Sequence, residues 1–269
     1  MTLTLLLLLA GAAPGWQPLF GRLPENAKGW SIENGVLHAL PASPLGTTDL
    51  FSPRQFRDFE FEVDYRVAPG GNSGIRYLPL AGRFVGVRKI AALLAAAAAM
   101  AAILLRRRPL AAALAALLCF SPAAVVWSYL NRHPLALEFQ VLDNQRHRDG
   151  RRGPLYRAGA LYGLSPAVED PSRPAGEWNQ ARVLVCGSRV EHWLNGKRVA
   201  AADLSEPNHR QARARFYGQG WYRIFLESEW SRLGLDRPSS IGLQHHGEEV
   251  WFRNARVRTA ECEAASAAP

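Results

Sequence analysis

Nine consecutive residues in the first quarter of the chain alternate strictly between apolar and charged side chains. In the segment Phe59–Val67, every odd position is apolar and every even position is charged. Successive side chains of a β-strand point to opposite faces, so this pattern predicts a strand with one buried and one solvated face. Such a strand favours a layered β fold, in which a second apolar surface covers the buried face.

Turn signals divide most of the remaining chain into further short strands. Asn34 and Gly35 separate two apolar runs, which predicts a β-hairpin. Residues 182–199, with turns at Gly187 and Asn195, predict a three-strand meander, and residues 249–258 predict a closing strand. Repeated short strands of this kind predict an all-β jelly-roll sandwich, which we assign to residues 16–77 and 134–260.

Residues 78–133 interrupt this pattern with an insert rich in Ala and Leu. Two uncharged runs, 90–105 and 110–130, lie on either side of Arg106, Arg107 and Arg108 and favour an inserted α-helical hairpin. The second run is long enough to cross a bilayer, whereas the first is marginal. Three alternatives stay open: membrane contact through residues 85–130, a helical hairpin that faces solvent or packs on itself, and partial disorder.

The insert also accounts for most of the positive charge. The chain has 32 basic and 23 acidic residues, a formal net charge of +9, and residues 78–137 contain seven basic residues and no acidic ones. Removing those seven charges leaves +2 for the rest of the chain. The sequence therefore does not indicate a nucleic-acid partner, because the basicity belongs to one apolar segment.

The N-terminal residues point to an exported protein, and the cysteines limit which cross-links and metal sites are possible. Residues 1–13 form an apolar stretch that ends in small residues, which predicts a signal peptide and a periplasmic or secreted location, with a membrane tether if the insert spans. Cys119, Cys186 and Cys262 lie far apart and lack the spacing of a zinc site. We expect no metal cluster and no disulfide framework, and leave open a single bridge between Cys186 and Cys262.

One predicted strand carries polar side chains on a single face. Glu138 and Gln140 share a face, opposite Phe139, and Asp143 joins them only if the strand bulges or ends near residue 142. The order Glu-x-Gln-x-x-Asp is similar to the Glu-x-Asp-x-x-Glu strand of laminarinase-type glycosidases. It leaves open a retaining glycosidase, whose two carboxyl groups lie about 5 to 5.5 Å apart. The alternative is that Glu138 and Asp143 are ordinary strand-edge carboxylates paired with nearby arginines.

The glycine-rich run at 70–74 predicts a tight turn or a bulge. It lacks the G-x-S-x-G pattern of a nucleophile elbow, and the chain has no Walker or Rossmann glycine pattern.

Taken in order, the segments resemble the 3-keto-disaccharide hydrolase domain family from residue 16 to residue 258, apart from the insert. The matching segments are Trp30 with ENGVL at 33–37, DFEFEVDY at 58–65, GNSGI at 71–75, EFQVLDN at 138–144, AGALY at 158–162, GEWN at 176–179, HWLNG at 192–196, GLQ at 242–244 with HG at 246–247, and VWFRN at 250–254.

The resemblance implies a concanavalin-like lectin/glucanase sandwich that bacteria export and that acts on 3-oxo-glycosides. Oxidation at C3 of a sugar acidifies the hydrogen on C2, so such a site needs a base near C2, donors for the enolate oxygen and an acid for the leaving group. The titratable candidates are Glu138, Asp143, His147 and His246. The candidates for binding a carbohydrate substrate are Asn72, Arg76, Gln140, Tyr162, Trp178, Asn179, His192 and Gln244. A divalent metal held by carboxylate and histidine stays open, although no compact ligand motif indicates one.

Two positions depart from the family pattern. Where many members have LQDHG and LYDL, this chain has His245 and Gly163 in place of the acidic residue. If either carboxylate served the chemistry, the chain would be a carbohydrate-binding relative and not an enzyme.

Overall fold

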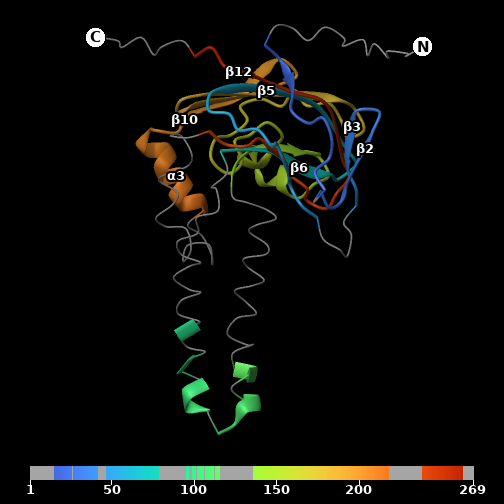
Figure 1. Ribbon diagram of the computed structural model, residues 1–269. Helices are drawn as coiled ribbons and strands as arrows, with labels where there is room; N and C mark the ends of the chain where they lie inside the picture. The colour runs from blue at the N-terminus through green and yellow to red at the C-terminus, as the bar shows by residue number, and fades with distance from the viewer. Residues whose placement is uncertain are drawn as a thin grey trace, which may run out of the picture.

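The structure, a computed structural model, describes residues 15–25, 27–41, 47–78, 136–217 and 238–262, and parts of 95–115. The predicted signal peptide, residues 1–13, lies outside the described residues. Two antiparallel sheets make up the body of the protein (Figure 1). The predicted β-sandwich is therefore confirmed.

The larger sheet has the strand order β10-β9-β8-β5-β12-β3-β2, and β1 pairs with the second half of β12. Its strands are β1 (Gln17–Pro18), β2 (Trp30–Glu33), β3 (Val36–Ala39), β5 (Phe59–Val67), β8 (Asn179–Cys186), β9 (Arg189–Leu194), β10 (Lys197–Asp203) and β12 (Val250–Thr259). The predicted meander corresponds to β8, β9 and β10.

The smaller sheet has the order β4-β11-β6-β7. Its strands are β4 (Leu50–Phe51), β6 (Asn72–Tyr77), β7 (Leu137–Leu142) and β11 (Gly242–Leu243). Two 3₁₀ turns, Asp149–Arg152 and Pro154–Tyr156, follow β7, and helix α3 (Pro207–Tyr217) follows β10.

The core lies between the two sheets. The apolar side chains of Phe59–Val67 are all buried, which confirms the predicted alternation, and they face Ile75, Tyr77, Phe139 and Val141 of the smaller sheet. A hydrogen bond of 2.7 Å joins the Tyr77 hydroxyl to Nε2 of His192, so one buried polar pair connects the sheets. Because Ile75 and Phe139 point inward, the residues that alternate with them along β6 and β7 point out of the sandwich.

Tight turns set the register of the hairpins, as the sequence predicts. Asn34 and Gly35 have φ values of 50° and 78°, and Asn195 and Gly196 have φ values of 48° and 80°. Two consecutive residues with positive φ are typical of a type I′ turn, whose twist matches that of the flanking strands.

A disulfide bridge joins Cys186 at the end of β8 to Cys262, three residues after β12. The single bridge that the sequence left open is therefore present. It ties the chain after β12 to the larger sheet across 76 residues of sequence.

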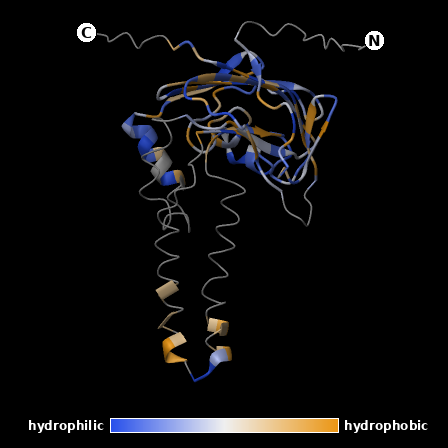
Figure 2. Cartoon of the chain, in the orientation of Figure 1, coloured by the Kyte–Doolittle hydropathy of each residue, from blue (hydrophilic) through white to orange (hydrophobic). Residues whose placement is uncertain are grey.

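The insert leaves β6 and returns at β7, whose last pair is Tyr77 with Leu137. Its described residues are helical at 95–96, 99–100, 102–104, 109–111 and 113–115, and the rest of the predicted helical hairpin lies outside the described residues. The helical pieces lie at the end of the insert that is farthest from the sandwich (Figure 1). They are largely apolar, and the turn between them is hydrophilic (Figure 2). Within the described part of the chain, no helix has both the length and the apolar character needed to cross a membrane.

Candidate active site

Strand register gathers five of the predicted residues on the outward face of the smaller sheet. Arg76 pairs with Glu138, and Gly74 pairs with Gln140. Paired residues of antiparallel strands share a face, and Asn72 lies two residues before Gly74. Gln244 continues the line of β11, where its N–H donates to the carbonyl of Gly74 at 2.8 Å. The face therefore carries Asn72, Arg76, Glu138, Gln140 and Gln244.

Glu138 is a buried carboxylate held by an arginine. Nη2 of Arg76 lies 3.2 Å from Oε2 of Glu138, and Nη1 of the same arginine lies 3.1 Å from Oδ2 of Asp49. Burial raises the pKa of Glu138, with Asp49 adding to the rise, while Arg76 and His246 oppose it. The carboxyl group therefore binds a proton more tightly than an exposed glutamate does, and the contact with Arg76 fixes its orientation.

The Glu138 side chain lies across the neighbouring strand β6 at Gly74, which has no side chain to block it. The amide of Gln140, with its nitrogen toward the acceptors, donates to Oε1 of Glu138 at 3.0 Å and to the carbonyl of Ser73 at 3.1 Å. Each carboxylate oxygen therefore has its own donor, Gln140 for one and Arg76 for the other.

A second polar group lies beside β7, because residues 158–162 run alongside it. The N–H of Tyr162 donates to the carbonyl of Glu138 at 3.0 Å. The Tyr162 hydroxyl donates to Oδ2 of Asp149 at 3.1 Å, and Arg152 binds the other oxygen of Asp149 at 3.1 Å. Burial raises the pKa of Tyr162, and the charges of Asp149 and Glu138 raise it further. Tyr162 is therefore a neutral hydrogen-bonding group.

Two histidines from different loops meet at this site. The rings of His147 and His246 are perpendicular, with centroids 6.2 Å apart. Nδ1 of His246 lies 2.9 Å from Oε2 of Glu248, which leaves Nε2 as its other ring nitrogen. The hydrogen bond to Glu248 is the main cause of a raised pKa for His246, to which the charge of Glu138 contributes. Burial lowers the pKa of His147. The two rings therefore differ in proton affinity, which is raised at His246 and lowered at His147.

Asp143 has a different position from the other candidate acids. Strand β7 ends at Leu142, and the Asp143 carboxylate accepts backbone N–H groups of Gly70, Gln145 and Arg146 at 3.0 to 3.2 Å. Burial alone would raise its pKa, but these hydrogen bonds hold the pKa of Asp143 below its usual value. Its contacts are those of a residue that shapes the turn after β7.

Three predicted substrate-binding residues lie outside the site. His192 is in the core, where Nδ1 binds the carbonyl of Gly159 at 2.9 Å and burial lowers its pKa to about 4. Asn179 binds backbone groups of Arg173 and the side chain of Asn195. The ring of Trp178 contacts the guanidinium groups of Arg66 and Arg253, which belong to the larger sheet, at 5.1 and 4.1 Å from its centre. Alternation alone could not distinguish these positions from site residues.

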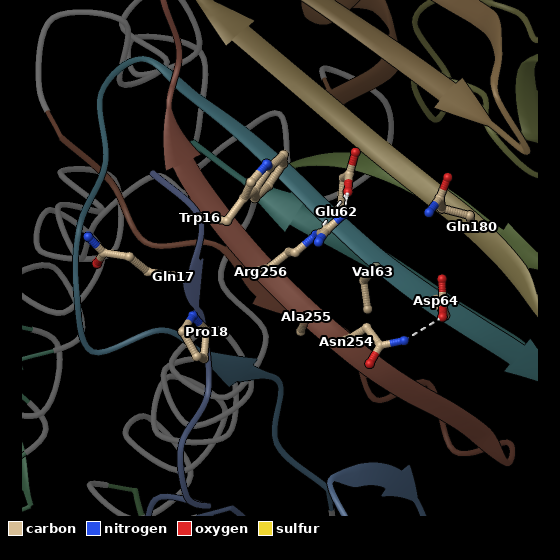
Figure 3. Close-up of a pocket in the computed structure, with 10 residues that line it drawn as sticks. All are labelled: Trp16, Gln17, Pro18, Glu62, Val63, Asp64, Gln180, Asn254, Ala255 and Arg256. Carbon is tan, nitrogen blue, oxygen red and sulfur yellow. Dashed lines mark hydrogen bonds and ion pairs between the residues drawn. The ribbon is translucent and has the colours of Figure 1, made fainter. Parts of the chain in front are cut away.

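A hollow of about 460 Å³ lies on the outer face of the larger sheet (Figure 3). Its lining includes Trp16, Glu62, Gln180 and Arg256, and Asn254 points to Asp64. Glu62 and Asp64 alternate with core residues of β5, so the hollow and Glu138 lie on opposite sides of the core. None of the predicted site residues lines it.

Sequence reasoning missed three carboxylates of the site: Asp49, Asp149 and Glu248. Asp49 precedes the two-residue strand β4, Asp149 begins the first 3₁₀ turn two residues after His147, and Glu248 lies in the loop two residues after His246. For Asp149 and Glu248, the sequence signal was their closeness to the candidate histidines His147 and His246, and Asp49 had no such signal. Among the described residues, no group of three His, Cys, Asp or Glu side chains is arranged to hold a metal ion.

The two departures from the family pattern have local explanations. His245 is buried with its ring against Trp30, and its Nε2 lies 2.9 Å from the carbonyl of Gly29. Position 245 therefore points away from the face that carries Glu138. At Gly163, a Cβ atom would come within 2.1 Å of the Phe216 ring, which also contacts Tyr162. An aromatic ring from α3 thus occupies the space that a side chain at 163 would need.

Comparison with known proteins identifies the family of the chain. The sequence model of the 3-keto-alpha-glucoside-1,2-lyase-like domain matches residues 13–80 and 130–258 and omits most of the insert. A 3-keto-disaccharide hydrolase from Bacteroides thetaiotaomicron is 27% identical over 252 residues, which cover 91% of this chain and 74% of the relative. Two crystal structures of Parabacteroides distasonis proteins share the fold, with TM-scores of 0.59 and 0.56 at 20% and 22% identity; the matches cover 92% and 91% of this chain and 89% and 99% of theirs. The chain therefore belongs to the 3-keto-alpha-glucoside-1,2-lyase-like domain family, as its sequence segments predict, and is an enzyme of the class that cleaves glycosidic bonds.

Proposed function

We propose that the protein cleaves 3-oxo-glycosides by eliminating the C1 substituent across C1 and C2 and then adding water to the unsaturated sugar. The observation that carries this proposal is the position of Glu138. It is a buried carboxylate with a raised pKa, on a sheet face lined by Arg76, Gln140 and Gln244. Family membership supports the same chemistry.

Glu138 is the proposed base. A carboxylate removes a proton most effectively when its pKa approaches the working pH, and burial moves Glu138 in that direction. Its carboxylate takes the C2 proton, and the electron pair of the C2–H bond enters the enolate formed with the C3 carbonyl.

Arg76 and Gln244 are the proposed substrate contacts on the same face, and Arg76 donates to the enolate oxygen. The Arg76 guanidinium is fixed by two carboxylates, so its orientation is set before substrate arrives. Oε1 of Gln244 is buried and has no hydrogen-bond partner within the described residues, so a turn of this side chain toward the substrate would let it accept from a sugar hydroxyl.

His246 is the proposed acid. Its hydrogen bond to Glu248 raises the pKa of His246, so the imidazolium can give a proton to the leaving oxygen as the C1–O bond breaks. The products are an unsaturated 3-oxo sugar and a free alcohol. In the second step, water adds to C1, neutral His246 takes its proton, and protonated Glu138 returns a proton to C2.

The competing reactions need residues that lie elsewhere. A retaining glycosidase built on Glu138 and Asp143 would need both carboxylates at the bond, whereas Asp143 is held by three backbone N–H groups. A binding face built on Trp178 would use the other sheet.

We further propose that the enzyme acts outside the cytoplasm. The Cys186–Cys262 bridge is of a kind that forms in oxidising compartments, and residues 1–13 have the composition of a signal peptide.

The test is incubation of the purified protein with the 3-oxo and unoxidised forms of one glycoside, with and without chelator. We expect release of the alcohol from the 3-oxo form alone. Cleavage of only the unoxidised form would select the retaining glycosidase, and turnover of neither would remove the enzymatic proposal. Loss of turnover with chelator would add a metal to the site.

A further inference from the structure

The tip of the insert, whose described residues lie between 99 and 115, exposes many large apolar side chains. Of the seven large apolar side chains that are exposed in the described part of the chain, five lie between residues 100 and 114. They are Met100, Ile103, Leu104, Leu110 and Leu114, with exposed fractions of 56 to 86%. An apolar surface of this kind on a soluble domain usually marks a site of interaction with a protein or a membrane.

The charges of the tip indicate which of these it contacts. Arg107 and Arg108 lie in the turn between the helical pieces, and residues 78–137 contain seven basic residues and no acidic one. Two copies that met tip to tip would bring like charges together without a compensating carboxylate. A surface of anionic phospholipids provides both acyl chains for the apolar side chains and phosphates for the guanidinium groups.

We propose that the tip of the insert, whose described residues lie between 99 and 115, enters an anionic phospholipid bilayer and tethers the enzyme to it. The uncharged runs 90–105 and 110–130 on either side of the Arg triplet make the surrounding sequence compatible with a lipid environment.

The tether would join the sandwich next to the active site. The insert leaves and enters the smaller sheet at the Tyr77–Leu137 pair, and the next pair along the two strands is Arg76 with Glu138. Because Glu138 pairs with Arg76 directly beside this junction, a membrane tether would attach to the sandwich at the edge of the Glu138 face.

The experiment is flotation of the purified full-length protein on a density gradient with lipid vesicles. We expect it to float with vesicles that contain phosphatidylglycerol and phosphatidylcholine, and to float less with pure phosphatidylcholine. Leu104→Glu with Leu110→Glu should lower the floated fraction at least tenfold. Arg107→Ser with Arg108→Ser should remove the preference for phosphatidylglycerol.

The matched control is Ile32→Glu with Val168→Glu, which places the same charges at the two other exposed apolar positions, on the sandwich. This control should float like the unmodified protein. Unchanged far-ultraviolet circular dichroism in every variant shows that folding is intact.

The proposal is overturned if the unmodified protein stays at the bottom with both vesicles, or if the leucine variant floats as well as the control. A dimer in light scattering that only the leucine variant loses, without flotation, would assign the tip to a second copy of the chain instead. Flotation is independent of catalysis, so its failure is distinguishable from failure of the proposed reaction.

Discussion

The side chain of Glu138 lies directly over Gly74 on the neighbouring strand. A Cβ atom at position 74 would come within 2.6 Å of both Cγ and Cδ of Glu138. The glycine of the GNSGI segment is therefore explained by a carboxylate 64 positions later, and not by a turn, because Asn72–Tyr77 is regular strand.

Gly74→Ala should displace the Glu138 carboxylate and lower kcat/KM by about 10- to 100-fold, since a shift of about 1 Å in a reacting group can cost that much. Steady-state kinetics on the 3-oxo-glycoside measures the effect. Gly21→Ala is the matched control, because a Cβ there would meet nothing within 4 Å. Equal activity in the two variants would show that the position of Glu138 is not critical.

Glu138→Gln should keep the fold and lower kcat by roughly 10²- to 10⁴-fold, because an amide cannot take the C2 proton. A direct measurement is exchange of the C2 hydrogen of the 3-oxo substrate with deuterium, followed by NMR, which should stop. Glu33→Gln, on an exposed position of β2, should exchange normally. Exchange that continues in Glu138→Gln would assign the base elsewhere.

The pH dependence of kcat/KM should be bell-shaped. Activity is lost as pH falls through the raised pKa of Glu138, because the base becomes protonated, and as pH rises through the raised pKa of His246, because the acid loses its proton. Glu248→Gln removes the main cause of the raised pKa of His246, so the alkaline limb should move to lower pH. Glu249→Gln, whose carboxylate contacts His38, should leave both limbs in place. An unmoved alkaline limb in Glu248→Gln would exclude His246 as the acid.

Replacing Cys186 and Cys262 by Ser should lower the free energy of unfolding by about 2 to 4 kcal/mol, because the bridge restrains a long loop of the unfolded chain. Urea unfolding followed by tryptophan fluorescence measures this change. Reducing agent should destabilise the unmodified protein as much as the double replacement does, and a protein indifferent to reductant would contradict the bridge.

Buried His192 should make the protein less stable in acid. Its pKa of about 4 lies below the usual 6.5, so the unfolded chain binds its proton first as pH falls. The stability from neutral His192 is complete above pH 6.5 and is lost between pH 6.5 and 4, to a total of about 3 kcal/mol. His192→Gln should flatten this part of the unfolding curve, whereas His209→Gln on α3 should retain it. Equal slopes in the two variants would place His192 in contact with water.

Local sequence determined the strands, because alternation and turn residues act over a few positions. Phe59–Val67 reveals its buried face by composition alone, and Asn34 with Gly35 forms a turn that needs no distant contact. The pairing of Glu138 and Gln140 on one face follows from the same period of two. The family resemblance added the order of the segments and the class of reaction.

Only the tertiary structure decided which polar residues form the site. Asp49, Arg76, Glu138 and His246 come together through sheet register and loop packing across nearly 200 positions, which periodicity does not encode. The same packing placed His192 in the core and fixed Asp143 in a turn, because backbone N–H groups and buried hydroxyls there needed partners. Sequence determines which side chains share a strand face, and the contacts between strands and loops determine which of these side chains form the candidate active site.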